Sequence, residues 1–128
     1  VSTARDYARF CQMVLAGGEL NGERVLRKET VREMTSNHLP PEALPMTIMG
    51  APLPGTGFGL GVSVLMQSTV EKHGNADAGE FGWSGAASTT FWVAPKPEMF
   101  VLVLQQLEPF SFELPLAIKP AIYAAIED

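Results

Sequence analysis

The sequence has 128 residues, enough for a single domain, and it is acidic, with a formal net charge of −5. Apolar residues make up 46% of it and charged residues 18%, which is typical of a globular domain with a buried core. The negative charge disfavours nucleic acid as a partner, because phosphate binding requires clustered Lys and Arg. No apolar run approaches the roughly 20 residues of a membrane span. A single cysteine, Cys11, permits no internal disulfide and leaves the compartment open.

The N-terminal stretch predicts a helix that begins just after Thr3. Thr3 and Asp6 stand at the spacing of a capping box, in which both side chains bind free backbone N–H groups. Five apolar residues then recur at the spacing of one helical face: Tyr7, Phe10, Cys11, Val14 and Leu15. Gly17-Gly18 predicts the end of the helix. Cys11 on this face is interpreted as a small buried hydrophobe and not as a nucleophile.

The next segments predict a short link, a second helix, a loop and a strand. Asn21-Gly22 is the turn signal of a short hairpin, and Lys28–Ser36 is expected to form a helix. Pro40–Gly57 is rich in proline and glycine and is interpreted as a long loop. The alternation of apolar residues in Phe58–Met66 predicts one strand.

The C-terminal half predicts a polar turn, a group of strands and a last helix. The polar segment is Glu71–Gly79. Three expected strands follow at hairpin spacing, which favours antiparallel pairing: Phe81–Trp83, Ala87–Val93 and Met99–Gln105. The last helix is expected to begin near Leu114, or only at Pro120, which would kink a helix interior. This order of elements predicts an α+β fold, an antiparallel β-sheet flanked by helices.

Residues that could perform chemistry are sparse. No His or Cys pair stands at metal-ligand spacing, so neither a metal nor a cofactor is expected, and His38 and His73 are interpreted as solvated loop residues. Gly82-Trp83-Ser84-Gly85 begins like a nucleophile elbow, but Ala86 occupies the place of the second glycine and a strand is expected next. No serine precedes a lysine by three positions. The sequence therefore predicts no complete catalytic machinery.

Several segments, in order along most of the chain, resemble the C-terminal third of serine hydrolases of the β-lactamase-like, penicillin-recognising family. The resemblance is greatest to class C β-lactamases and the esterases related to them. It rests on six segments: Ser2–Phe10, Gly22–Leu26, Glu29–Val31, Gly57–Gly61, Gly82–Ala86 and Phe91–Lys96. It implies an incomplete β-lactamase/transpeptidase-like fold, in which residues 1–128 are one domain and the C-terminal portion of a larger serine hydrolase.

The resemblance also implies the site. Trp83-Ser84-Gly85 occupies the place of the family's Lys-Thr-Gly triplet on the strand beside the active site, which makes these three residues substrate-binding candidates. Ala86 would offer its backbone N–H to an oxyanion hole. Trp83 in place of the lysine is similar to the esterases of the family and favours an esterase over a true β-lactamase. The resemblance implies that three further parts of the site lie upstream of this chain: the family's nucleophilic serine, its lysine and its catalytic tyrosine motif. Tyr7 and Tyr123 do not match the tyrosine motif.

The expected ligand is a small-molecule ester or a β-lactam.

In the family the last strand, here Met99–Gln105, pairs with N-terminal strands. If those are absent, its apolar edge should recruit another chain, which predicts a homo-oligomer or a missing N-terminal segment at this edge. Two alternatives stay open: a peptidase of the same family that acts on D-amino-acid or cell-wall peptides, and a non-catalytic binding module that uses a groove beside Trp83 and Trp92.

Overall fold

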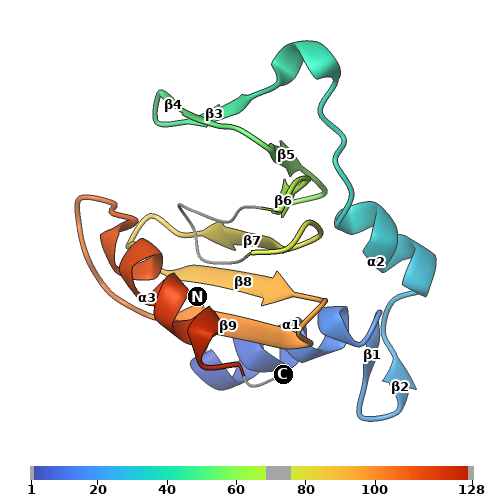
Figure 1. Ribbon diagram of the computed structural model, residues 1–128. Helices are drawn as coiled ribbons and strands as arrows, with labels where there is room; N and C mark the ends of the chain where they lie inside the picture. The colour runs from blue at the N-terminus through green and yellow to red at the C-terminus, as the bar shows by residue number, and fades with distance from the viewer. Residues whose placement is uncertain (1, 69–75, 127–128) are drawn as a thin grey trace.

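The computed structural model describes residues 2–68 and 76–126. Its centre is a five-stranded antiparallel sheet with the strand order β5-β6-β7-β8-β9. Helix α1 (Ala4–Leu15) covers one face of this sheet and helix α3 (Glu113–Ala124) covers the other (Figure 1). The bounds of the five strands are Thr56–Phe58, Ser63–Leu65, Phe81–Ser84, Thr90–Ala94 and Met99–Val103. The predicted α+β fold with an antiparallel sheet is confirmed.

The first helix begins and ends as predicted. The hydroxyl of Thr3 accepts a hydrogen bond from the N–H of Asp6 at 3.1 Å, and Gly17 follows the helix with a φ of 66°, the left-handed conformation that glycine adopts readily. Burial raises the pKa of the Cys11 thiol to about 11. Cys11 therefore stays a neutral thiol at physiological pH, in agreement with its interpretation as a core residue.

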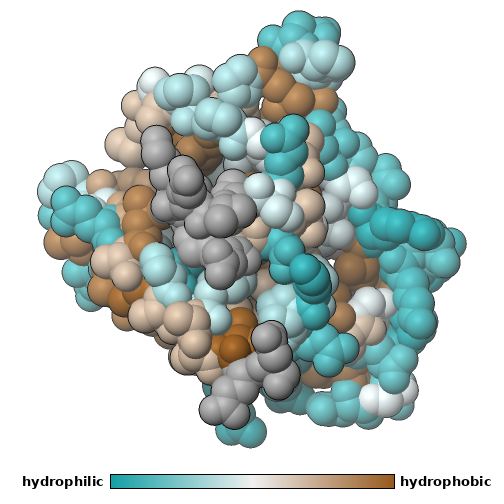
Figure 2. Space-filling model, in the orientation of Figure 1, coloured by the Kyte–Doolittle hydropathy of each residue, from teal (hydrophilic) through white to brown (hydrophobic). Residues whose placement is uncertain are grey.

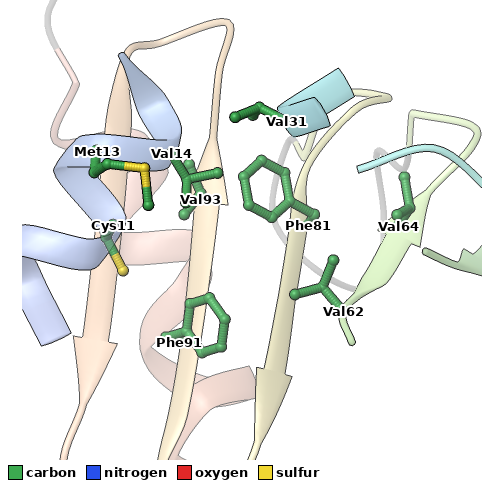
Figure 3. Close-up of a cluster of buried hydrophobic side chains, with 9 residues drawn as sticks. All are labelled: Cys11, Met13, Val14, Val31, Val62, Val64, Phe81, Phe91 and Val93. Carbon is green, nitrogen blue, oxygen red and sulfur yellow. The ribbon is translucent and has the colours of Figure 1, made fainter. Parts of the chain in front are cut away.

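The core lies between α1 and the sheet. Residues from α1, from α2 (Lys28–Met34), from the strands and from the β5–β6 turn form one cluster of buried side chains (Figure 3). Its members are Cys11, Met13, Val14, Val31, Val62, Val64, Phe81, Phe91 and Val93. Burying side chains of this size stabilises the fold by about 1.5–3 kcal/mol each. The cluster therefore fixes β7 and β8 against α1.

The short elements after α1 also agree with the sequence. Strands β1 (Glu19–Leu20) and β2 (Glu23–Arg24) form the expected hairpin. Its two turn residues, Asn21 and Gly22, have φ values of 53° and 82°, as a type I′ turn requires. The second helix is confirmed, although it ends at Met34 and not at Ser36.

The prediction of one strand over Phe58–Met66 is wrong. This segment is the hairpin of β5 and β6, which pair from Thr56↔Leu65 to Phe58↔Ser63. Gly61 in its turn has a φ of 89°. Gly59 passes so close to α2 that a Cβ there would lie 2.1 Å from the carbonyl oxygen of Met34. The apolar alternation is therefore interrupted by two glycines that a turn and a close approach require.

The loop predicted for Pro40–Gly57 is also wrong in part. It contains a short 3₁₀ helix, Pro41–Ala43, and a hairpin of β3 (Met46–Ile48) and β4 (Ala51–Leu53). The turn at Met49-Gly50 has φ values of 51° and 80°. This two-stranded hairpin tolerates Pro52 because a strand at an edge needs fewer of its N–H groups.

Smaller differences occur in the C-terminal half. The strand expected at Ala87 begins only at Thr90, and the last strand ends at Val103 instead of Gln105. The last helix begins at Glu113 and continues through Pro120, so the start at Pro120 is wrong. Residues 71–75 of the expected polar turn lie outside the described residues.

The surface is uneven in character. On the face seen in Figure 2, hydrophilic side chains gather over α2 and the β1–β2 hairpin, and hydrophobic ones lie over α3 and the connection before it. Exposed apolar residues of that region include Leu104, Leu107, Leu114 and Leu116. Within residues 2–68 and 76–126, no helix has both the length and the apolar character needed to cross a bilayer.

Candidate active site

The four candidate site residues lie where β7 ends and turns into β8. Strands β7 and β8 pair from Phe81↔Val93 to Ser84↔Thr90. Residues 85–89 connect them, so Trp83 and Ser84 belong to the strand, and Gly85 and Ala86 begin the connection. The short connection holds these residues at one end of a rigid hairpin.

Ala86 is a central residue of a β-turn. The N–H of Ser88 donates to the carbonyl oxygen of Gly85 at 2.9 Å, and the N–H of Gly85 donates to Thr89 at 2.8 Å. Ala86 therefore occupies the second of the four positions of the turn, and it is exposed. Among the described residues, no acceptor binds its N–H. This donor is free to bind a ligand.

The edge of β7 next to Ala86 is open. Of the described strands, β6 pairs with β7 only at Phe81 and Gly82. Because Gly85 directs its N–H toward β8, the alternation of an antiparallel strand directs the N–H and C=O of Ser84 away from β8. Ser84 therefore presents unpaired backbone groups on the edge that leads to Ala86.

A cavity of about 820 Å³ lies beside this edge. It is lined by Trp83, Ser84 and Gly85, by the start of α1, by the turn between β5 and β6, and by the end of β9. Ala87 also lines it, so Ala86 stands exposed between two lining residues. The described residues along this cavity include no charged side chain. The cavity is therefore suited to a neutral ligand.

The side chains of the triplet have distinct surroundings. Trp83 is 37% exposed, and its ring packs edge-on against Phe58 with the centroids 4.8 Å apart. The hydroxyls of Ser84 and Thr90 share a hydrogen bond of 3.0 Å across the hairpin. A Cβ at Gly85 would lie 2.6 Å from the hydroxyl oxygen of Thr89. A larger residue at this position would therefore require the Thr89 side chain to move.

Within residues 2–68 and 76–126, no histidine or other base is hydrogen-bonded to the Ser84 hydroxyl. The Ser84 hydroxyl pairs with Thr90, which is not a base. His38 follows α2, with its N–H bonded to the carbonyl oxygen of Phe58 and Nε2 2.8 Å from the carbonyl oxygen of Glu33, and His73 lies outside the described residues. In the described part of the chain, no three His, Cys, Asp or Glu side chains gather to hold a metal ion.

One polar cluster was not predicted, and it lies on the opposite face of the sheet, under α3. The Glu80 carboxylate accepts hydrogen bonds from the Lys119 ammonium and from the Tyr123 hydroxyl. Burial, with the hydrogen bond to Glu80 and its charge, raises the pKa of Tyr123, so the phenol stays neutral. The ammonium also lies 5.1 Å from the centre of the Trp92 ring. The spacing of Lys119 and Tyr123, four residues apart on a helix, was the available signal.

The fold and this site define the chain as a β-lactamase/transpeptidase-like sheet with its covering helices. The chain belongs to the β-lactamase family, since the family model described as Beta-lactamase matches residues 1–120. It is 38% identical over 108 residues to the uncharacterized protein MT1414 of Mycobacterium tuberculosis. The aligned region covers 82% of this chain and 27% of that protein. The chain thus spans about a quarter of this curated relative.

Solved structures agree in fold. EstCE1, described as a hydrolase with promiscuous acyltransferase activity, superimposes with a TM-score of 0.74 at 24% identity, over 95% of this chain and 30% of that one. The β-lactamase Mb2281c of Mycobacterium bovis superimposes with a TM-score of 0.71 at 24% identity, over 98% of this chain and 43% of that one. At this level of identity the likeness establishes the fold alone.

Proposed function

We propose that this chain forms one wall of the active site of a carboxylesterase of the β-lactamase family. In this proposal Ala86 donates its N–H to the oxyanion that develops on the ester carbonyl, and Trp83, Ser84 and Gly85 contact the substrate. The observation that carries the proposal is an exposed N–H at the open edge of β7 to which no described residue is bonded, beside a cavity whose described lining is uncharged. Backbone donors of this kind stabilise the charge that appears during acyl transfer.

The nucleophilic serine and its lysine would be supplied by a part of the protein upstream of this chain. The serine oxygen would attack the ester carbonyl, the alcohol would leave with a proton, and water would then release the acid. The chain spans only about a quarter of its curated relative, which is in keeping with a C-terminal portion of a larger hydrolase. Alone, this chain should be inactive.

The uncharged lining favours a neutral ester over the family's other substrates. A β-lactam or a D-amino-acid peptide carries a carboxylate, which would need a cation in the pocket to offset its desolvation. Trp83 stands where the family has lysine, so that cation is missing from the triplet. Weak activity on β-lactams is compatible with this proposal. A peptidase of the same family remains the second candidate.

The test compares this chain with a chain extended upstream to include the missing part. We expect the extended chain alone to hydrolyse p-nitrophenyl butyrate. Its kcat/KM for this ester should be at least about tenfold higher than for a D-alanyl-D-alanine peptide, because burying the peptide's unpaired carboxylate costs more than about 1.4 kcal/mol. Preference for the peptide would establish the peptidase instead. Inactivity of both chains on every substrate would favour a non-catalytic binding module.

We also propose that the free edge of β9 recruits a second polypeptide. Among the described strands, β9 pairs with β8 and has no neighbour on its other side, and open apolar edges associate. We expect sedimentation of this chain as a dimer, and a shift toward monomer in the variant Leu104→Lys, which adds a charge at an exposed position beside the edge. The extended chain should not dimerise, since its own strands would cover the edge. A wild-type chain that stays monomeric would contradict this proposal.

A further inference from the structure

Ser88 has an unusual position in the connection between β7 and β8. It is completely buried, at 0% exposure, and its φ of 65° lies in the left-handed region that residues other than glycine seldom adopt. Such a conformation persists only where the surroundings determine it, and it is often found at functional sites. Ser88 lies two residues after Ala86 in the same turn.

Every hydrogen-bonding group of Ser88 is occupied. Its hydroxyl donates to the carbonyl oxygen of Leu107 at 2.8 Å and accepts from the N–H of Ser111 at 3.0 Å. Its carbonyl oxygen accepts from the side-chain amide of Gln105 at 2.8 Å. Its N–H donates to Gly85 and closes the turn around Ala86. One buried residue thus ties the turn to the segment that follows β9.

The rest of the turn has few anchors of its own. Gly85, Ala86 and Ala87 carry no polar side chain that could hold them. The N–H of Leu107 donates to the carbonyl oxygen of Ala87 at 3.1 Å, and this bond comes from the same segment that Ser88 binds. The direction of the Ala86 N–H is therefore held by the hydrogen bonds of Ser88, together with the bond from the Gly85 N–H to the Thr89 carbonyl oxygen and the bond to Ala87.

We infer that Ser88 is the positioning residue for the oxyanion-hole donor, because its buried hydroxyl and carbonyl lock the turn that presents the N–H of Ala86. This inference rests on the proposed function of Ala86. A donor that is displaced by about 1 Å loses much of its effect on a transition state, and misplacement of that size can cost about 10²-fold in rate. The turn would be held by a serine and not by glycine because only the hydroxyl reaches both Leu107 and Ser111.

The discriminating variant is Ser88→Gly in the extended chain. Glycine adopts the left-handed conformation without strain, so the substitution removes the hydroxyl while leaving the backbone conformation allowed. We expect kcat for p-nitrophenyl butyrate to fall about 10- to 100-fold with KM within about threefold. The affinity for phenylboronic acid, whose adduct with the nucleophilic serine resembles the tetrahedral intermediate, should fall in parallel. The control Ser36→Ala also removes a serine hydroxyl, one that donates to Arg32 at the end of α2, and should leave kcat unchanged.

A second measurement separates this inference from the proposed function. In the 128-residue chain labelled with ¹⁵N-alanine, the amide signal of Ala86 should shift or broaden in Ser88→Gly but not in Ser36→Ala. An unmoved signal together with an unchanged kcat would overturn the role of Ser88, which would then be structural only. A moved signal with an unchanged kcat would overturn the role of Ala86 and with it both proposals. A wild-type extended chain that hydrolyses no ester would end the proposed function, and the amide signal would still decide whether Ser88 holds the turn.

Discussion

Replacing Ala86 with proline in the extended chain is expected to lower kcat for a short-chain ester by about 10²- to 10³-fold, the usual cost of removing one oxyanion-hole donor. Proline has no N–H, so the substitution deletes the proposed donor directly. KM should change little, because the donor acts on charge that develops only in the transition state. The measurement is steady-state hydrolysis of p-nitrophenyl butyrate by folded protein.

The turn itself should tolerate this proline. Ala86 follows Gly85 in a turn that is closed by the Ser88 N–H, and proline is favoured at this position of common β-turns. Ala86 is also exposed, so the ring displaces no core residue. A loss of activity in a variant with wild-type stability can therefore be attributed to the missing N–H.

The matched control is Ala86→Ser. This variant keeps the N–H and changes only a side chain that projects from an exposed position, so kcat should stay within about threefold of wild type. Equal kcat values for Ala86→Pro and the wild type would remove Ala86 from the mechanism. Equal losses in both variants would point to a steric effect at the cavity instead of a lost donor.

The parts of the fold that could be predicted are those with local signals. Thr3 and Asp6 marked the start of α1, and Asn21-Gly22 marked the first hairpin, because each pattern satisfies backbone groups within a few residues. Gly59 could not be interpreted in this way. Gly59 must lack a side chain because the carbonyl oxygen of Met34 lies where its Cβ would be. Met34 is 25 residues away in the sequence, and only folding brings the two together.

The same distinction applies to the candidate site. The resemblance to a family, which six ordered segments carry, predicted Trp83 and Ala86 as site residues, and they stay candidates. It located neither Ser88 nor Glu80. A run of small polar residues gives no sign that Ser88 is buried with a φ of 65°, because its partners at Leu107 and Ser111 become neighbours only when β9 has paired with β8.

The buried pair of Lys119 and Glu80 leads to the largest expected effect on stability. The side chains are 14% and 9% exposed, respectively. Removing one partner of a buried ion pair leaves an unpaired charge away from water, which typically costs about 3–5 kcal/mol. We therefore expect Lys119→Met to lower the free energy of unfolding by about this amount, measured by urea denaturation with tryptophan fluorescence.

An exposed ion pair of the same kind provides the control. Lys96 binds Asp77 at 2.9 Å, but its side chain is 74% exposed, so Lys96→Met should cost at most about 1 kcal/mol. The double variant Glu80→Gln/Lys119→Met removes the buried charge as well and should recover most of the loss, because a neutral amide needs less compensation than a carboxylate. If the Lys119 and Lys96 variants were equally stable, water would have to reach Glu80 beneath α3. The helix would then be held to the sheet by its apolar contacts and not by this cluster.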